Sequence, residues 1–162
     1  MTDLLPLLEE FYREKLASLL RHESGARLVG QYDFNNTYQY IINREDVQLR
    51  WVGQAIAELG GLADNTVTAP ERQAQGKADA AARAIMEEDQ REAQSFVERW
   101  RPRVEAMSNA RQRGMLRVIL GETLEQKRFF EQALAGQLDL LGRRPDHVGP
   151  RVGSVMSSRW IE

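Results

Sequence analysis

The sequence predicts an all-α protein, an antiparallel four-helix bundle, and three observations lead to this fold class. First, apolar residues recur at spacings of three and four positions in four long segments. Second, the 162 residues include only 12 Gly and 5 Pro, and 28% of them are charged, which is typical of amphipathic helices. Third, two short links and one long link join the segments, a connectivity that occurs in such bundles.

The composition limits the function classes that the chain can serve. Its 22 basic and 24 acidic residues give a formal charge of −2, which provides no field to attract nucleic acid. The absence of cysteine excludes disulfides, thiolate metal sites and cysteine nucleophiles. The start, MTDLLPLLEE, is acidic where a signal peptide is basic, and no apolar run approaches the roughly 20 residues of a membrane span. We therefore expect a cytoplasmic protein with no membrane or nucleic-acid partner.

The first two predicted helices are followed by the long link. Leucines and Tyr12 share one face of a helix over roughly residues 3–22. A second helix over roughly 33–59 ends at the Gly-Gly pair that follows it, because glycine accepts the left-handed geometry of a helix end. The link over 61–76 reaches about 50 Å when extended. It is therefore long enough to run back along the second helix, which is about 40 Å long.

The third and fourth predicted helices are joined by a tight turn. The third covers roughly residues 77–106, and Pro102 is expected to kink it or end it early. The turn reads MSNA and offers a serine or asparagine cap, so the fourth helix doubles back beside the third. It covers roughly residues 110–141, and its inward positions include Leu138. Residues 1–141 thus form the bundle, and 142–162 are expected to be an irregular tail, docked by Trp160.

Each predicted helix carries polar residues near the middle of its apolar stripe. In the second helix, Glu45 and Gln48 fill the helical spacing between Ile41 and Val52. An unpaired buried polar group costs about 1–3 kcal/mol, so several at one level must satisfy one another or a ligand. The other helices carry the same interruption at Tyr12, at Asp89 or Gln90, and at Thr123 and Gln126.

Two of these stretches resemble the ferritin-like superfamily, the bacterioferritins and rubrerythrins. REDVQLRWVGQAIAELGGL is similar to the family's second helix, where a glutamate and a histidine three positions later precede a run ending in Leu-Glu-Gly or Leu-Gly-Gly. ILGETLEQKRFFEQAL is similar to the fourth helix, and the resemblance covers roughly residues 3–141. It implies the same bundle, a crossover between helices two and three, a homodimer through helices one and two, and two bound iron or manganese ions.

Most of the ligand positions that the resemblance implies carry other residues in this chain. The second-helix glutamate corresponds to Glu45, but the histidine three positions later corresponds to Gln48. The first-helix glutamate falls near Tyr12, the third-helix carboxylate on Gln90 (or on Asp89 if the register shifts by one), and the fourth-helix glutamate and histidine on Thr123 and Gln126.

Charge decides how this set of residues is interpreted. Two divalent ions bring about four positive charges into the core, whereas Glu45 offers one negative charge and the other positions are neutral. The two histidines, His22 and His147, lie outside the ligand positions, so no imidazole is expected in the layer. We therefore hypothesise a non-catalytic ferritin-like bundle without a cofactor. A hydrogen-bonded polar layer would replace its di-metal centre, and it would act as a scaffold or binding protein.

Alternatives remain open at this stage. A divergent metal-dependent oxidoreductase could hold iron or manganese for oxidase or peroxide chemistry through hard carboxylates, namely Glu45, Asp89, Glu122 and Glu125, with Glu92 as a further candidate. Glu45 could instead face solvent and pair with an arginine. Finally, the arginine-rich turn between helices three and four, or the tail with Trp160, could dock a protein partner.

Overall fold

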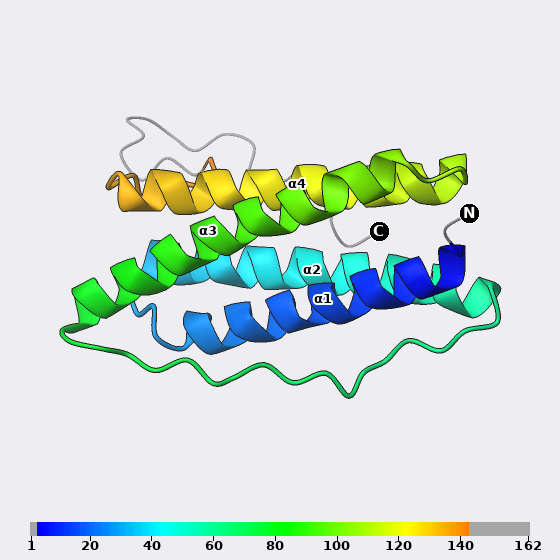
Figure 1. The fold of residues 1–162 in the computed structure, drawn as a ribbon. Coiled ribbons are helices and arrows are strands. Elements are labelled where there is room, and N and C mark those ends of the chain that lie inside the picture. The colour runs from blue at the N-terminus through cyan, green and yellow to red at the C-terminus, as the bar shows by residue number, and fades with distance from the viewer. Residues whose placement is uncertain (1–2, 143–162) are drawn as a thin grey trace, which may run out of the picture.

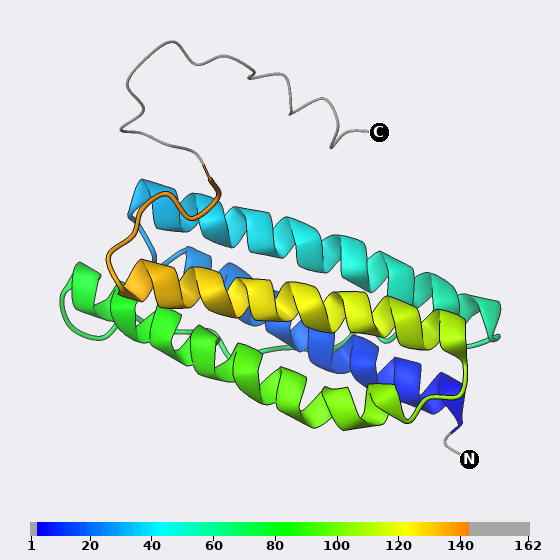
Figure 2. The same cartoon turned by 90° about the horizontal axis from the view of Figure 1, so that it is seen from above.

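The computed structural model describes residues 3–142 and confirms the all-α four-helix bundle. Its helices are α1 (Leu4–Ala26), α2 (Tyr32–Glu58), α3 (Ala78–Glu105) and α4 (Ala110–Leu134), and the described residues contain no strand. The helices lie side by side as two hairpins, α1 with α2 and α3 with α4 (Figure 1). Seen from above, α4 lies between α2 and α3, and α1 lies behind it (Figure 2).

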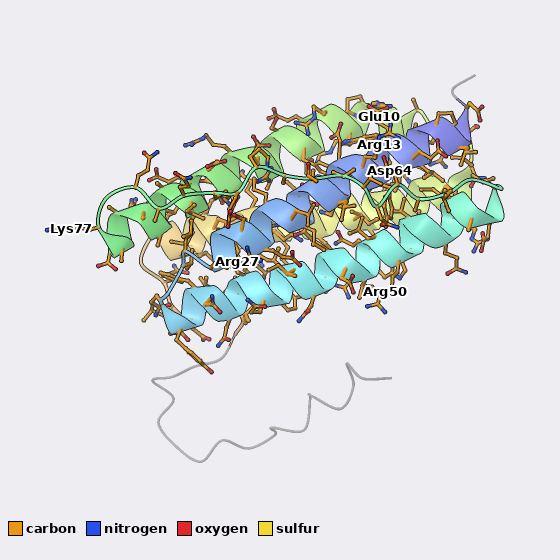
Figure 3. The ribbon with its side chains drawn as sticks, turned by 90° about the horizontal axis from the view of Figure 1, so that it is seen from below. Glu10, Arg13, Arg27, Arg50, Asp64 and Lys77 are labelled. Carbon is orange, nitrogen blue, oxygen red and sulfur yellow. The ribbon has the colours of Figure 1, made fainter. Side chains whose placement is uncertain are left out.

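A long crossover, residues 59–77, connects the two hairpins. It leaves the end of α2, runs in an extended path along α1 and enters α3 at the opposite end of the bundle (Figures 1 and 3). Three hydrogen bonds attach it to α1: the Tyr12 hydroxyl donates to Asn65 Oδ1 at 2.6 Å, the Arg72 amide donates to Ser24 Oγ at 2.8 Å, and Arg72 Nη1 donates to the Arg21 carbonyl oxygen at 3.3 Å. This return path makes α2 and α3 parallel, whereas the helices that contact one another are antiparallel.

Local chemistry explains where α4 begins and ends. The Asn109 side chain caps its first turn by accepting a 3.0 Å hydrogen bond from the Gln112 amide, as the MSNA turn predicts. The helix ends at Leu134, because Gly136 adopts a left-handed φ of +87° that terminates the helical path. The predicted end at 141 is therefore wrong, and Leu138, expected inside, is 46% exposed.

α1 ends later than predicted, whereas α3 ends within one residue of its predicted end at 106. α1 continues to Ala26, past the predicted end at residue 22. α3 continues past Pro102 to Glu105, so the expected early end does not occur. Proline removes only one backbone donor near a helix end, and the fully buried Trp100 and Val104 hold this last part of α3 against the core.

The apolar core is divided into two clusters. The larger one is built around Phe11, whose ring packs edge-on against Phe96 and Trp100 at centroid distances of 5.4 and 4.8 Å. The second is built around Tyr38 and Phe130, whose ring centroids are 5.4 Å apart. Buried polar side chains lie among these apolar residues, and they form the candidate site.

The tail expected over 142–162, including His147 and Trp160, lies outside the described residues apart from Gly142. None of the helices within residues 3–142 is both long enough and apolar enough to cross a membrane.

Candidate functional site

A layer of charged and polar side chains crosses the middle of the bundle. Glu45, Gln48 and Asp89 have no exposed surface, and Thr123 and Gln126 are nearly as buried. These residues come from α2, α3 and α4. Because Glu45 is fully buried, the alternative in which it faces solvent is wrong.

Glu45 contacts two residues of α1, Lys15 and His22. Its Oε1 forms a short hydrogen bond with His22 Nδ1, and its Oε2 lies 3.4 Å from Lys15 Nζ. Lys15 also donates to Thr123 Oγ1 on α4 at 3.3 Å. Lys15 is 1% exposed and His22 3% exposed, so this cluster of Lys15, His22, Glu45 and Thr123 is an interior network that ties α1, α2 and α4 together.

Burial and pairing act in opposite directions on this ion pair. Burial by itself would raise the pKa of Glu45, but the attraction of His22 and Lys15 outweighs it and holds the pKa below its ordinary value. Burial lowers the pKa of Lys15, and the nearby Glu45 carboxylate opposes this only in part. Glu45 is therefore a carboxylate at neutral pH, and the two α1 side chains compensate its charge.

Asp89 on α3 has a second set of partners. The Arg72 guanidinium, from the crossover, places Nη1 at 2.8 and 2.9 Å from the two carboxylate oxygens. The Tyr38 hydroxyl donates to Oδ2 at 2.5 Å, and Arg21 Nε donates to Oδ1 at 3.3 Å. Burial lowers the pKa of Arg72, but attraction to Asp89 more than reverses this shift. Burial, together with Asp89, raises the pKa of Tyr38 well above its ordinary value, so the phenol remains a donor.

Gln48 and Glu122 form a third contact, at the edge of the layer. Gln48 Nε2 donates to Glu122 Oε2 at 2.5 Å, and Arg44 binds the same carboxylate through Nε and Nη2. Glu122 is partly exposed. Glu125 lies on the surface, where its nearest polar partner is the Tyr40 hydroxyl at 3.5 Å. These two glutamates are therefore bound to groups of α2 at or near the surface.

Two residues of the predicted layer make their contacts elsewhere. The Tyr12 hydroxyl bonds to Asn65 on the crossover and to no residue of the layer. Gln90 is only half-buried and donates to Glu131 at 3.2 Å. Of the two register alternatives on α3, Asp89 is the residue that faces the interior.

The prediction of a neutral layer without imidazole is wrong. His22 lies inside α1, because this helix extends beyond the predicted end, and its ring faces Glu45. Lys15 was missed because a lysine in an amphipathic pattern is normally assigned to the surface. A signal was present: Leu8, Lys15 and His22 recur at heptad spacing on one face of α1. Arg72 had no comparable signal, because it lies in an irregular segment.

The layer does not fit a pair of metal ions. Glu45 Oε1 is hydrogen-bonded to His22 and its Oε2 faces the Lys15 ammonium group at 3.4 Å, while Arg72 donates to both oxygens of Asp89. A divalent ion at Glu45 would lie beside the Lys15 ammonium, which would repel it in this low-dielectric interior. Within residues 3–142, no three His, Asp or Glu side chains form a group suited to hold a metal ion. Of the alternative set of Glu45, Asp89, Glu122 and Glu125, the latter two are bound by Arg44 and the Tyr40 hydroxyl.

Protein groups alone do not satisfy every polar atom of the layer. Five buried atoms of the site have no hydrogen-bond partner within the protein: His22 Nε2, Glu45 Oε2, Gln48 Oε1, Arg72 Nε and Gln126 Nε2. Such atoms are uncommon in folded proteins because each one loses its hydrogen bonds to water. The layer is thus compensated in charge at Glu45 and Asp89, while its hydrogen bonding is incomplete.

Fold and layer together define a class: an antiparallel four-helix bundle with a charged core and a long crossover that contributes one arginine to that core. No protein-family model, no curated protein and no solved structure matches the chain. The ferritin-like resemblance therefore remains an inference from the residues quoted above.

Proposed function

We propose that this protein is a non-catalytic bundle of the ferritin-like type that acts as a scaffold or binding protein, and that Lys15 and Arg72 supply the positive charge that metal ions supply in such a core. The observation that carries the proposal is the pairing of each fully buried carboxylate with a cation of the same chain, Glu45 with Lys15 and Asp89 with Arg72. The hypothesis is thereby altered in one respect: the compensating layer is charged, not neutral.

Electrostatics favours this interpretation over a metal centre. An uncompensated carboxylate in a protein interior costs several kcal/mol, so each buried acid needs a permanent partner. An ammonium or guanidinium linked covalently to the chain is such a partner at every metal concentration. A metal ion would have to displace these groups and leave them buried without a counter-charge.

Side chains of the protein fill the layer, and the clefts that are open to a ligand lie at the surface of the bundle. A cleft of about 570 Å³ lies at one end, between the start of α1 and the α3–α4 turn, and is lined by apolar residues that include Leu4, Leu7 and Met107. A second, of about 460 Å³, lies between α1, α2 and the crossover, and Leu16 and Leu49 contribute to its wall. Both volumes fall in the range of small-molecule sites. The homodimer implied by the resemblance stays a prediction.

Elemental analysis of protein purified without added metal tests the proposal. We expect iron and manganese well below one equivalent per chain and a melting temperature that a chelator does not change, because no metal contributes to stability. A divergent iron or manganese oxidoreductase predicts the reverse. Roughly one or more equivalents of either metal, lost in Glu45→Ala, would overturn the proposal.

A further inference from the structure

The acceptors that surround the Arg72 guanidinium belong to α1 and α3, not to the crossover. Nη1 donates to both oxygens of Asp89 and lies 3.3 Å from the carbonyl oxygen of Arg21. Nη2 donates to the carbonyl oxygen of Ile85 at 3.0 Å and lies 3.3 Å from Glu88 Oε2. The helices therefore build this site, and the crossover only supplies the group that fills it.

The site has the shape of a guanidinium group. A Cβ at Gly25, inside α1, would lie 2.7 Å from Arg72 Nη1 and 3.1 Å from Ile85 Cγ2. A glycine lowers the stability of a helix interior relative to alanine. Gly25 therefore destabilises α1 locally, and the absence of a side chain leaves room for the guanidinium. Nη1 lies against the Asp89 carboxylate and the Arg21 carbonyl oxygen, whereas Nη2 donates to the Ile85 carbonyl oxygen. A guanidinium fork fills both nitrogen positions, and a single ammonium nitrogen fills only one of them.

The crossover is attached lightly apart from this arginine. None of the residues 59–77 is classed as buried, whereas the Arg72 side chain is only 7% exposed. Apart from Arg72, Asn65 is the crossover residue with a hydrogen bond to α1, through Tyr12. Figure 3 shows the strand-like path of this segment over α1 between Asp64 and Lys77. A segment with little buried surface opens at a lower free energy than the core.

We propose that the Asp89 site is a binding site for alkylguanidinium ligands, that Arg72 is its built-in occupant, and that an external guanidinium can take the site when the crossover lifts. The ligand class comprises small alkylguanidinium compounds and the arginine side chain of a second polypeptide, because both present the same planar fork. This role is separate from the proposal about metal ions. Metal content tests that proposal, and ligand binding tests this one.

Chemical rescue of Arg72→Ala is the direct test. The variant keeps Asp89, Tyr38 and Arg21 but removes the guanidinium, and it should melt at a lower temperature than the wild type. Methylguanidinium at about ten times its Kd should raise the melting temperature by about 3–6 °C. Methylammonium at the same concentration should not, because it lacks the fork. Nα-acetyl-arginine amide distinguishes the two sources of the ligand. If it also raises the melting temperature, the site accepts arginine side chains of a polypeptide. If only methylguanidinium does so, the site accepts small compounds alone.

Two matched double variants control for binding elsewhere. Adding Asp89→Asn removes the carboxylate, and adding Gly25→Ala places a methyl group 2.7 Å from the position of Nη1, too close for a guanidinium nitrogen to remain there. Neither double variant should respond to methylguanidinium.

Hydrogen exchange in the wild-type protein gives a second readout, which does not require a variant to fold. Millimolar methylguanidinium should accelerate exchange of the Arg72 amide, which is bonded to Ser24, while amides in the middle of α4 keep their rates. Acceleration at both places would mean general unfolding and would contradict the proposal. The proposal would be overturned if methylguanidinium and methylammonium raised the melting temperature of Arg72→Ala equally, or if the exchange rate of the Arg72 amide in the wild type did not change.

Discussion

Lys15 is the single residue on which the core most depends. It is fully buried, it neutralises Glu45, and it also holds Thr123 on the opposite helix. A buried ion pair adds little net stability relative to an apolar pair of similar volume, but removal of one partner leaves an uncompensated charge. The cost of a change at Lys15 therefore depends on whether Glu45 retains its charge.

The substitution Lys15→Met measures this dependence. We expect it to lower the free energy of unfolding by about 3–5 kcal/mol, and His22 should keep the loss toward the lower value by pairing with Glu45. The double variant Lys15→Met with Glu45→Gln should recover most of the loss, because no charge then remains unpaired. Urea denaturation measures both. If the double variant is no more stable than Lys15→Met, the residues are not coupled and the proposed pairing is wrong.

Among the elements, α4 has the clearest start signal. The Asn109 side chain accepts a hydrogen bond from the Gln112 amide, which has no partner within the helix. The backbone of the preceding turn is held separately, by the hydrogen bond from the Met107 amide to the Val104 carbonyl oxygen. The cap can therefore be removed without removing the α3–α4 connection.

We expect Asn109→Ala to lower the free energy of unfolding by about 1 kcal/mol, because the Gln112 amide loses its acceptor. Asn109→Asp keeps an acceptor at the same position and should have a much smaller effect. The measurement is again urea denaturation. Equal losses in the two variants would show that the cap does not stabilise α4.

At the scale of the whole molecule, the charged layer fixes how the helices align along the bundle axis. Apolar side chains tolerate a shift of one helical turn, about 5.4 Å, because one leucine replaces another. Such a shift of α2 would separate Glu45 from both Lys15 and His22 and leave it unpaired. We infer that the layer selects one alignment of four similar helices more than it adds stability.

The same layer makes the stability of the molecule sensitive to acid. The pKa of Glu45 in the folded protein lies below its ordinary value of 4.5. In the window between these values the unfolded state has bound a proton that the folded state has not, so a fall in pH favours unfolding. The contribution of Glu45 is thus complete above about pH 5 and is lost as the pH falls through its folded pKa.

Comparison with the double variant Lys15→Met, Glu45→Gln isolates this effect. The stability of the wild type relative to the double variant should decrease as the pH falls below about 5, by about 1.4 kcal/mol for each unit by which the pKa of Glu45 is depressed. Urea denaturation at a series of pH values provides the measurement. A difference in stability between the two proteins that does not change with pH would contradict a lowered pKa of Glu45.

The sequence by itself determined the four helices, the long crossover and the polar interruption of the α2 stripe at Glu45 and Gln48. These features are periodic or local, and the apolar spacing, the Gly-Gly pair after α2 and the asparagine before α4 each act within a few residues. The end of α4 was misjudged because one left-handed glycine, Gly136, outweighed the continuing apolar pattern.

Only the tertiary structure decided which groups compensate the buried acids. Lys15 and His22 reach Glu45 across a helix pair, and Arg72 reaches Asp89 from an irregular segment. Long charged side chains normally extend into water, so the heptad spacing that places Lys15 and His22 on the same face of α1 as Leu8 does not by itself show that they are buried. The packing of α1 against α2 and the return path of the crossover bring them to the carboxylates, and both are set by contacts between residues distant in the sequence.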